Sequence, residues 1–275
     1  MISNGEWNDN GEGIDTNSQS NGDLPAPQNG ACPSGSGSCT VITGNWIHDN
    51  NNRDVPGNGL GLVGAGVVVA GGRNDTIADN RFDNNGAWAV ALVPYITGID
   101  SGPSDCTDAG GTWDNPFIDA LSGGPACFFN DYGMRVHHNE FSGNGGFGNP
   151  TNGDLADLSD FSLIGIPPAV PGQRNCYFAN SDPAGLTFAP DNLQTTNGDC
   201  ATAGPGASVA DPLFGQVLCN LHQLTPDAPL CAGAVYPQQD ASFPLEPLPA
   251  EASMPGVCSA LPRTIPWCVP GHNRG

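Results

Sequence analysis

The stretch that decides the fold reads Ile77-Ala78-Asp79-Asn80-Arg81-Phe82-Asp83-Asn84-Asn85. Its pattern is an apolar residue, two spacers, Asn, one spacer, a second apolar residue, two spacers and a second Asn. We call this pattern the phrase. The phrase also occurs in two further full copies and two weaker ones, as Ile42/Asn45/Ile47/Asn50, Val136/Asn139/Phe141/Asn144, Ile2/Gly5/Trp7/Asn10 and Asn175/Tyr177/Asn180. A repeat at this scale predicts stacked supersecondary units rather than one globular core.

Each copy of the phrase predicts two short strands joined by a sharp corner, because the apolar residues flank a short polar pair. Asn suits the corner, since it tolerates the left-handed backbone conformation and hydrogen-bonds locally. Corners stacked at the sheet spacing of roughly 4.8 Å allow the amides to form an Asn ladder. Apolar runs at 13–14, 66–70, 87–93 and 185–188 then predict a third strand in each unit.

Three short strands per turn, with the turns stacked in parallel, resemble the right-handed parallel β-helix of the pectate-lyase-like superfamily, an all-β solenoid. The resemblance covers residues 1–190 and is specific for architecture, because this fold carries many activities. We expect about five coils over 1–200. Loops, several closed by disulfides, are expected as insertions on the solenoid, where binding sites are common, at 16–40, 50–65, 94–130, 145–153 and 159–173.

Residues 201–275 are rich in proline and carry four cysteines, and proline removes ladder donors. We therefore expect an irregular C-terminal tail that packs on the solenoid or caps it, with a helix over 212–224. The chain starts inside a repeat at Ile2, without a cap or a signal peptide. We expect further coils and the secretion signal upstream of this sequence.

The ten cysteines favour an oxidising compartment, so we expect a secreted or cell-surface protein. Connectivity does not follow from sequence alone, but short loops favour neighbouring pairs. A zinc site is the competing interpretation, and it is disfavoured because Cys-x-x-Cys and Cys/His clusters are missing. The favoured pairs are Cys32/Cys39, Cys106/Cys127, Cys176/Cys200, Cys219/Cys231 and Cys258/Cys268.

The formal net charge of -21, with seven arginines and no lysine, limits the partners. Such a surface repels nucleic acid, anionic lipid and polyuronates, unless calcium bridges the protein and an acidic glycan. Calcium ligands are available in Asn8/Asp9/Asn10, in 49–52 and in Asp83/Asn84/Asn85. Turn formation explains the same residues without a metal, so we predict no metal site and no cofactor.

Residues one and three positions after the first Asn of each phrase should point outward. They form one stripe of Glu6, Trp46, Arg81 and Glu140, and a second of Asn8, His48, Asp83 and Ser142, to which Arg135 and His137 are added. An aromatic ring beside charged groups is what a sugar-binding face requires. The predicted substrate-binding residues are thus Trp46, Arg81, Glu140, His137, His48 and Asp83, and the alternative is a solvated strand face with one exposed Trp.

Cleavage of a glycosidic bond needs two carboxyl groups that face it. Asp154 and Asp157 are candidates, together with Asp15 at a comparable point of the first unit, although a spacing of three places strand side chains on opposite faces. The family resemblance implies an Arg or Lys base on an exposed strand, and Arg135 and Arg73 are the candidates for it, although neither has a matching motif around it. Acidic residues that only decorate a strand end are the alternative. His137 and His138 alternate on a strand and lack a third ligand, which argues against a metal there.

The sequence predicts an extracellular protein that binds a polysaccharide or cell-surface glycan, acting as a monomer without nucleic-acid or membrane partners. Under the enzyme hypothesis it also processes that glycan, as a hydrolase, lyase or epimerase. The opposing hypothesis is a non-catalytic surface or structural module. A groove in which two carboxyl groups converge beside an aromatic ring would favour the enzyme, whereas single carboxylates along a flat face would favour the binder.

Overall fold

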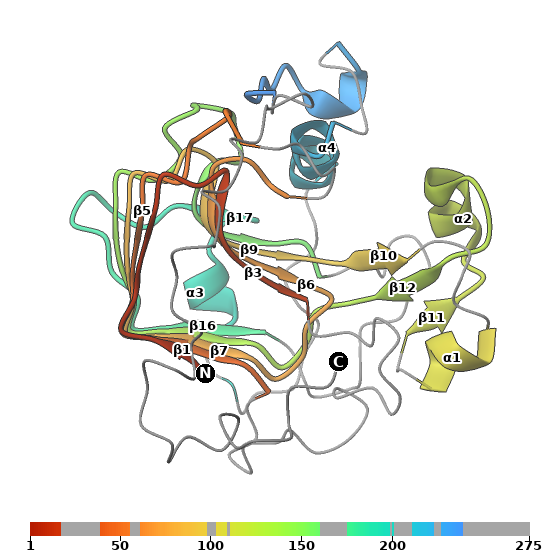
Figure 1. Cartoon of the computed structure of the whole chain (residues 1–275), viewed down its shortest axis with the longest axis horizontal. Coiled ribbons are helices and arrows are strands. Elements are labelled where there is room, and N and C mark those ends of the chain that lie inside the picture. The colour runs from red at the N-terminus through yellow and green to blue at the C-terminus, as the bar shows by residue number, and fades with distance from the viewer. Residues whose placement is uncertain are drawn as a thin grey trace, which may run out of the picture. The chain divides into compact units, whose positions relative to one another are not determined.

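The computed structural model describes residues 1–17, 39–55, 61–97, 103–108, 111–159, 175–198, 200, 211–222 and 227–238. Its regular structure consists mostly of strands in parallel sheets, with few helices (Figure 1). Three of these sheets, named A, B and C below, receive strands in turn as the chain advances. Strands far apart in sequence therefore lie side by side, as β4, β7 and β13 do.

The strands of each sheet follow in spatial order. Sheet A contains β1 (Ile2–Ser3), β4 (Val41–Thr43), β7 (Thr76–Ala78), β13 (Arg135–His137) and β16 (Cys176–Phe178). Sheet B contains β14 (Glu140–Ser142), β8 (Arg81–Asp83), β5 (Trp46–His48) and β2 (Glu6–Asn8). Sheet C contains β17 (Phe188–Ala189), β15 (Gly153–Asp157), β9 (Trp88–Val93), β6 (Ala65–Ala70) and β3 (Glu12–Asn17).

The pairing register aligns equivalent positions of the repeated phrase. Ile77 pairs with Ile42 on one side and with Val136 on the other, and Phe82 pairs with Phe141. These side chains are almost fully buried in one apolar core, where the two phenyl rings stack with centroids 5.1 Å apart. The apolar positions of the phrase therefore all point into the same interior, as predicted.

The first Asn of each phrase belongs to a buried ladder. The Nδ2 group of Asn45 donates to Oδ1 of Asn80 at 3.0 Å, Asn80 donates to Asn139 at 3.1 Å, and Asn139 donates to Asn180 at 3.0 Å. A second ladder connects Asn10, Asn50, Asn85 and Asn144 in the same way. The Asn-ladder prediction is confirmed.

The left-handed residue of each corner is not the ladder Asn but the residue before it. The φ angles are 56° at Asn4, 67° at Gly44, 57° at Asp79, 54° at His138 and 54° at Ala179. The prediction that Asn supplies this conformation was wrong. The ladder amide must point inward to reach its partners, so the change in chain direction falls on the preceding residue.

The predicted insertion at 94–130 has its own small sheet and two short helices. It contains β10 (Tyr95–Thr97), α1 (Pro103–Asp108), β11 (Thr112–Trp113), α2 (Pro116–Ser122) and β12 (Cys127–Phe129). The strand β12 pairs antiparallel with both β10 and β11. Of the predicted insertions, 16–40 and 159–173 fall mainly outside the described residues.

Three of the five predicted disulfides are present, between Cys106 and Cys127, Cys176 and Cys200, and Cys219 and Cys231. Cys39 is also disulfide-bonded. The predicted partner Cys32 and the pair Cys258 and Cys268 lie outside the described residues. Disulfides are typical of proteins in oxidising compartments.

Sheet C is covered on its outer face by α4 (Asp211–Asn220), which overlaps the helix predicted at 212–224 but ends four residues earlier. The helices α3 (Leu193–Thr196) and η3 (Pro229–Cys231) are shorter. Leu213 and Val217 of α4 share an apolar cluster with Val68 of β6.

The chain divides into two units, 1–241 and 242–275, and the second lies outside the described residues. Among the described helices, none has the length and hydropathy needed to cross a membrane.

Candidate functional site

The outer face of sheet B carries the two predicted stripes in register. Parallel pairing places Glu6, Trp46, Arg81 and Glu140 in one row, and Asn8, His48, Asp83 and Ser142 in the next. The residues between the rows point inward, so that Ile47, Phe82 and Phe141 are buried in the core. We call these two rows the Trp46 face. The phrase predicted which side chains share it, because strand alternation and register fix both.

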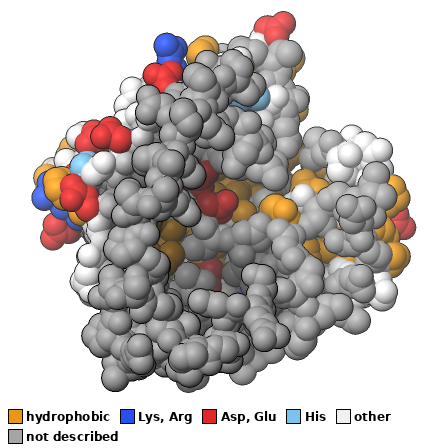
Figure 2. Space-filling view, viewed as in Figure 1, with side chains coloured by type: hydrophobic (Ala, Val, Ile, Leu, Met, Phe, Trp, Pro, Cys, Tyr) orange, Lys and Arg blue, Asp and Glu red, His pale blue; other side chains and the backbone are white. Residues whose placement is uncertain are grey.

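Trp46 is the large apolar side chain of this face, with 41% of its surface exposed. Its indole N–H donates to Oδ2 of Asp83 at 2.7 Å, and Nε of Arg81 lies 2.6 Å from the same oxygen. The guanidinium carbon of Arg81 lies 5.4 Å from the indole centre, a cation–π geometry. Hydrophobic, acidic, basic and His side chains gather at the left edge of Figure 2, near the place of β5 in Figure 1. The ring is therefore fixed and still accessible.

The imidazole of His48 stacks on the indole of Trp46, with the two ring centroids 3.9 Å apart. Its Nδ1 is 2.7 Å from Oδ2 of Asp49, and its Nε2 is 3.2 Å from Oε1 of Glu6. Burial disfavours the charged imidazole, but the hydrogen bonds and charges of the two carboxylates outweigh it and raise the pKa of His48. His48 thus adds a positive charge to this face more readily than a free imidazole.

An open hollow of about 510 Å³ adjoins His48. It is lined by Asn8, Asp9, His48, Asp49, Asn51 and Asn52. Amide and carboxylate groups around a hollow next to an aromatic ring offer donors and acceptors for several hydroxyl groups. From the sequence, Asn8 and His48 were expected on the outward stripe, and the other four residues were expected to form turns or to be available as calcium ligands. Their convergence on one hollow follows from the pairing of β2 with β5.

Arg135 and His137, which were added to the stripes, belong to a different sheet. Both lie on β13 of sheet A, where they pair with Thr76 and Ala78 of β7. The corner between sheets A and B separates them from the Trp46 face, so the prediction that both extend its stripes was wrong. Arg135 is exposed and His137 is half-buried.

Asp154 and Asp157 both lie in the interior, with 2% and 5% of their surfaces exposed. Asp154 accepts hydrogen bonds from Asn144 Nδ2 at 3.0 Å and from the Thr187 backbone at 2.9 Å, and so ends the second Asn ladder. Asp157 accepts from the Tyr177 hydroxyl at 2.7 Å. Asp154 and Asp157 were expected on opposite faces of the strand, but both face inward. The reason is that Asp154 and the next residue, Leu155, face inward in succession. Burial of both groups argues against contact with a glycan.

Asp15 lies on the outer face of sheet C and is exposed as a whole residue. Partial burial of its carboxyl group disfavours the charged form and raises its pKa. It lines a cavity of about 170 Å³ together with apolar residues of sheet C and α4, among them Val68, Leu158 and Val217. Acidic side chains lie beside hydrophobic ones in the recessed centre of Figure 2. Asp15 and the Trp46 face therefore lie on different sheets.

Glu12, which the sequence did not single out, is the more perturbed acid of β3. Burial raises its pKa to about 8, and the nearby charge of Asp15 adds to this. One carboxyl oxygen accepts from the Leu62 N–H at 2.9 Å, and the other is buried without a hydrogen-bond partner. Glu12 pairs with Ala65, whose side chain belongs to the outer cluster, so Glu12 and Asp15 share the outer face despite their spacing of three.

Replacing Glu12 by Gln is expected to raise the free energy of unfolding at pH 9 by about 3 kcal/mol, a linkage value reduced for water access. In the unfolded chain this carboxyl group loses its proton near pH 4.5, whereas in the folded protein it keeps the proton to about pH 8. The wild type therefore loses stability as the pH rises through this window, and the variant does not. Urea unfolding at pH 4.5 and pH 9 measures the difference, with Glu140→Gln on the exposed Trp46 face as the control. An equal effect of Glu12→Gln at both pH values would contradict this prediction.

No group of three or more His, Cys, Asp or Glu side chains in the part of the chain that the structure describes is arranged to hold a metal ion. No protein-family model matches this chain, and neither a curated protein nor a solved structure matches it significantly.

Proposed function

We propose that this protein is a secreted or cell-surface carbohydrate-binding protein, built as a right-handed parallel β-helix similar to the pectate-lyase-like superfamily. The cyclic order of sheets A, B and C and the Asn ladders support that architecture. The disulfides support an extracellular location. The proposed binding site is the Trp46 face, and it needs no cofactor.

The observation that carries this proposal is the exposed and immobilised indole of Trp46. Asp83 holds its N–H, Arg81 lies over the ring, and His48 stacks beside it. A fixed aromatic surface loses little conformational entropy when a sugar ring stacks on it. The neighbouring carboxylates and amides then supply partners for hydroxyl groups, as in sites that combine an apolar surface with a few polar groups.

The charge of the Trp46 face favours a neutral glycan. Glu6, Asp49 and Glu140 are acidic, and the arginine of the face is paired with Asp83. A polyuronate would meet like charges there, at a cost in affinity. Neutral plant or microbial polysaccharides are therefore the substrate class that the proposal names first.

Replacing Trp46 by Ala is expected to weaken glycan binding at least tenfold, which corresponds to about 1.4 kcal/mol. The measurement is a glycan array with the wild type, followed by calorimetric titration with neutral β-linked gluco-, xylo- and manno-hexasaccharides and with hexagalacturonate. Phe117→Ala is the matched control, because Phe117 of α2 has 37% of its surface exposed and lies outside sheet B. Equal losses in both variants would contradict a site at Trp46. A wild type that binds none of these glycans would favour the non-catalytic structural module instead.

Glycan processing is the second candidate function, and the perturbed acid Glu12 beside Asp15 favours it. Glycoside cleavage uses two carboxyl groups that face one bond. On the Trp46 face, by contrast, Asp83 is engaged by Trp46 and Arg81, and both Glu6 and Asp49 contact His48. Reducing-sugar and unsaturated-product assays with the wild type and Glu12→Gln test it. Processing requires product from the wild type and its loss in the variant, and binding without product would exclude processing of the glycans tested.

A further inference from the structure

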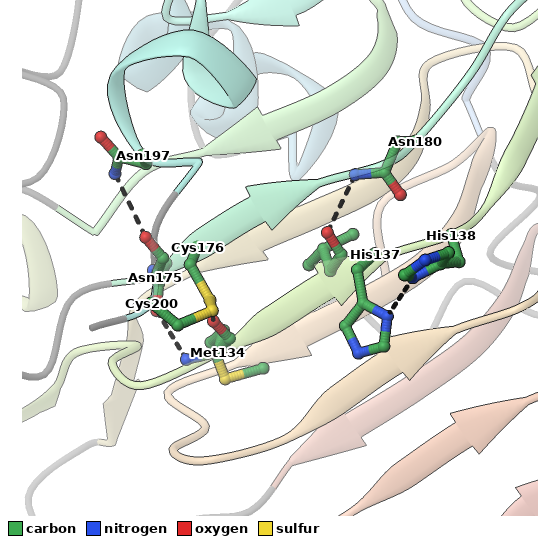
Figure 3. The surroundings of a disulfide bond; sticks show 9 residues. Met134, His137, His138, Asn175, Cys176, Asn180, Asn197 and Cys200 are labelled. Atoms are coloured by element: carbon green, nitrogen blue, oxygen red, sulfur yellow. Dashed lines mark hydrogen bonds between the residues drawn. A yellow bond between two sulfur atoms is a disulfide. The ribbon is translucent and has the colours of Figure 1, made fainter. Parts of the chain in front are cut away.

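His137 and His138 form a pair at the corner between sheets A and B. The left-handed φ of 54° at His138 turns the chain so that both rings lie on the same outer side. Their Nδ1 atoms are 2.9 Å apart, and Figure 3 shows the two rings directed toward one another. The sequence expectation that the rings alternate on a strand therefore fails at this corner, because His138 lies just beyond the end of β13.

Both rings are held in place by Phe178 of the neighbouring strand β16. The His137 ring stacks on the phenyl ring with centroids 4.5 Å apart and planes 15° apart. The His138 ring meets the same phenyl ring edge-on at 5.7 Å. The planes of the two imidazoles differ by 87°, so the pair is fixed in a crossed arrangement.

We propose that His137 and His138 chelate a divalent transition metal through their Nδ1 atoms, with Cu²⁺ preferred. Bonds of 2.0–2.1 Å from one metal to two nitrogens at a right angle place those nitrogens about 2.9 Å apart. A tetrahedral angle would separate them by about 3.3 Å. The observed separation therefore fits the tetragonal geometry of Cu²⁺ better than the tetrahedral geometry of Zn²⁺, and Cu²⁺ also binds nitrogen ligands more tightly.

Charges of both signs surround the pair. The guanidinium group of Arg135 opposes a bound cation, whereas the carboxylate of Asp79 favours one. A neutral imidazole is the form that binds a metal. Asp79 precedes the ladder Asn at the equivalent corner of the adjacent strand, and its carboxylate offsets part of the metal charge. His138 is exposed, so water fills the remaining coordination positions.

A single N–H···N hydrogen bond between the two rings is the competing explanation of their contact. It requires one proton between the Nδ1 atoms and no metal, whereas the chelate requires that proton to leave. The two explanations therefore differ in what happens when Cu²⁺ is added. This site is independent of the Trp46 face, since it lies on sheet A.

The test is titration of the full, disulfide-bonded chain with CuSO4 at pH 7.5, followed by calorimetry and electron paramagnetic resonance. We expect one site whose spectrum shows two nitrogen ligands and whose affinity for Cu²⁺ exceeds that for Zn²⁺. His137→Gln and His138→Asn should each weaken Cu²⁺ binding at least tenfold, and Asn at position 138 tolerates the left-handed backbone. His222→Asn is the matched control at an exposed His elsewhere.

Thermal unfolding of the metal-free variants shows whether they are folded. The proposal is overturned if both folded variants bind Cu²⁺ as tightly as the wild type, or if the wild-type spectrum lacks two nitrogen ligands.

Discussion

Replacing Asn80 by Ala is expected to lower the free energy of unfolding by about 3 kcal/mol, because several buried polar groups lose their partners at once. Asn80 is 2% exposed. Its Oδ1 accepts from the backbone N–H and the side-chain amide of Asn45, both at 3.0 Å. Its Nδ2 donates to the backbone carbonyls of Ile42 and Ala78 and to Asn139. Alanine fills none of these roles.

The Asn80 prediction is measured by urea unfolding at pH 7, followed by circular dichroism. Asn10→Ala is the matched control, since Asn10 is half-buried at the end of the second ladder and, among the described residues, its side chain donates to Asn50 alone. We expect that control to cost less than about 1 kcal/mol. If Asn80→Ala is no more destabilising than Asn10→Ala, the ladders do not stabilise the stacked strands.

The register of the stacked strands could be predicted because the sequence states it redundantly. Apolar residues such as Ile77 and Phe82 fix which side chains face inward, and Asn80 and Asn85 fix where the corners stack. If a strand slips by one residue, its apolar side chains turn outward and its ladder Asn loses its partners at the same time. One register therefore satisfies both requirements. The Trp46 face followed from the same register, since its members are the outward positions that remain.

The sequence could not predict the faces of sheet C, because its strands depart from simple alternation. Asp154 contacts the interior Asn144, and the next residue, Leu155, belongs to the core. Two successive inward residues then place Glu12 and Asp15 on one outer face and both Asp154 and Asp157 inside. Strict alternation would instead place residues three apart on opposite faces, and so would separate Glu12 from Asp15 and Asp154 from Asp157.

The contact between His137 and His138 was missed for a related reason. Alternation holds only within a strand, and His138 adopts the left-handed conformation beyond the end of β13. The antiparallel pairing of β12 in the 94–130 insertion was also missed, because that segment lacks the repeated phrase. Predictions of side-chain direction were accurate for the repeated phrase in sheets A and B, whereas they failed for sheet C and beyond the strand ends.

Replacing Asp157 by Ala is expected to lower the free energy of unfolding by 3 kcal/mol or more, roughly the cost of breaking a buried, charged hydrogen-bond network. Its carboxylate accepts from the Tyr177 hydroxyl at 2.7 Å, from Asn175 Nδ2 at 3.2 Å and from the backbone of Ser159 at 2.9 Å. Tyr177 is fully buried, and burial together with the charge of Asp157 raises the pKa of its hydroxyl group well above the ordinary value. The hydroxyl therefore remains a donor, and the variant leaves it without this acceptor.

This outcome separates a structural role of Asp157 from the catalytic role that the sequence predicted. A catalytic carboxylate can be removed with little loss of stability, because its charge contributes to the reaction rather than to packing. The comparison is urea unfolding of Asp157→Ala against Asp15→Ala, whose side chain is exposed on sheet C. Tyr177→Phe supplies the second arm, since it removes the donor instead of the acceptor, and the double variant should then cost less than the sum of the two single variants. The catalytic role would be supported instead if Asp157→Ala were as stable as the wild type but failed to cleave a glycan that the wild type cleaves under the same conditions.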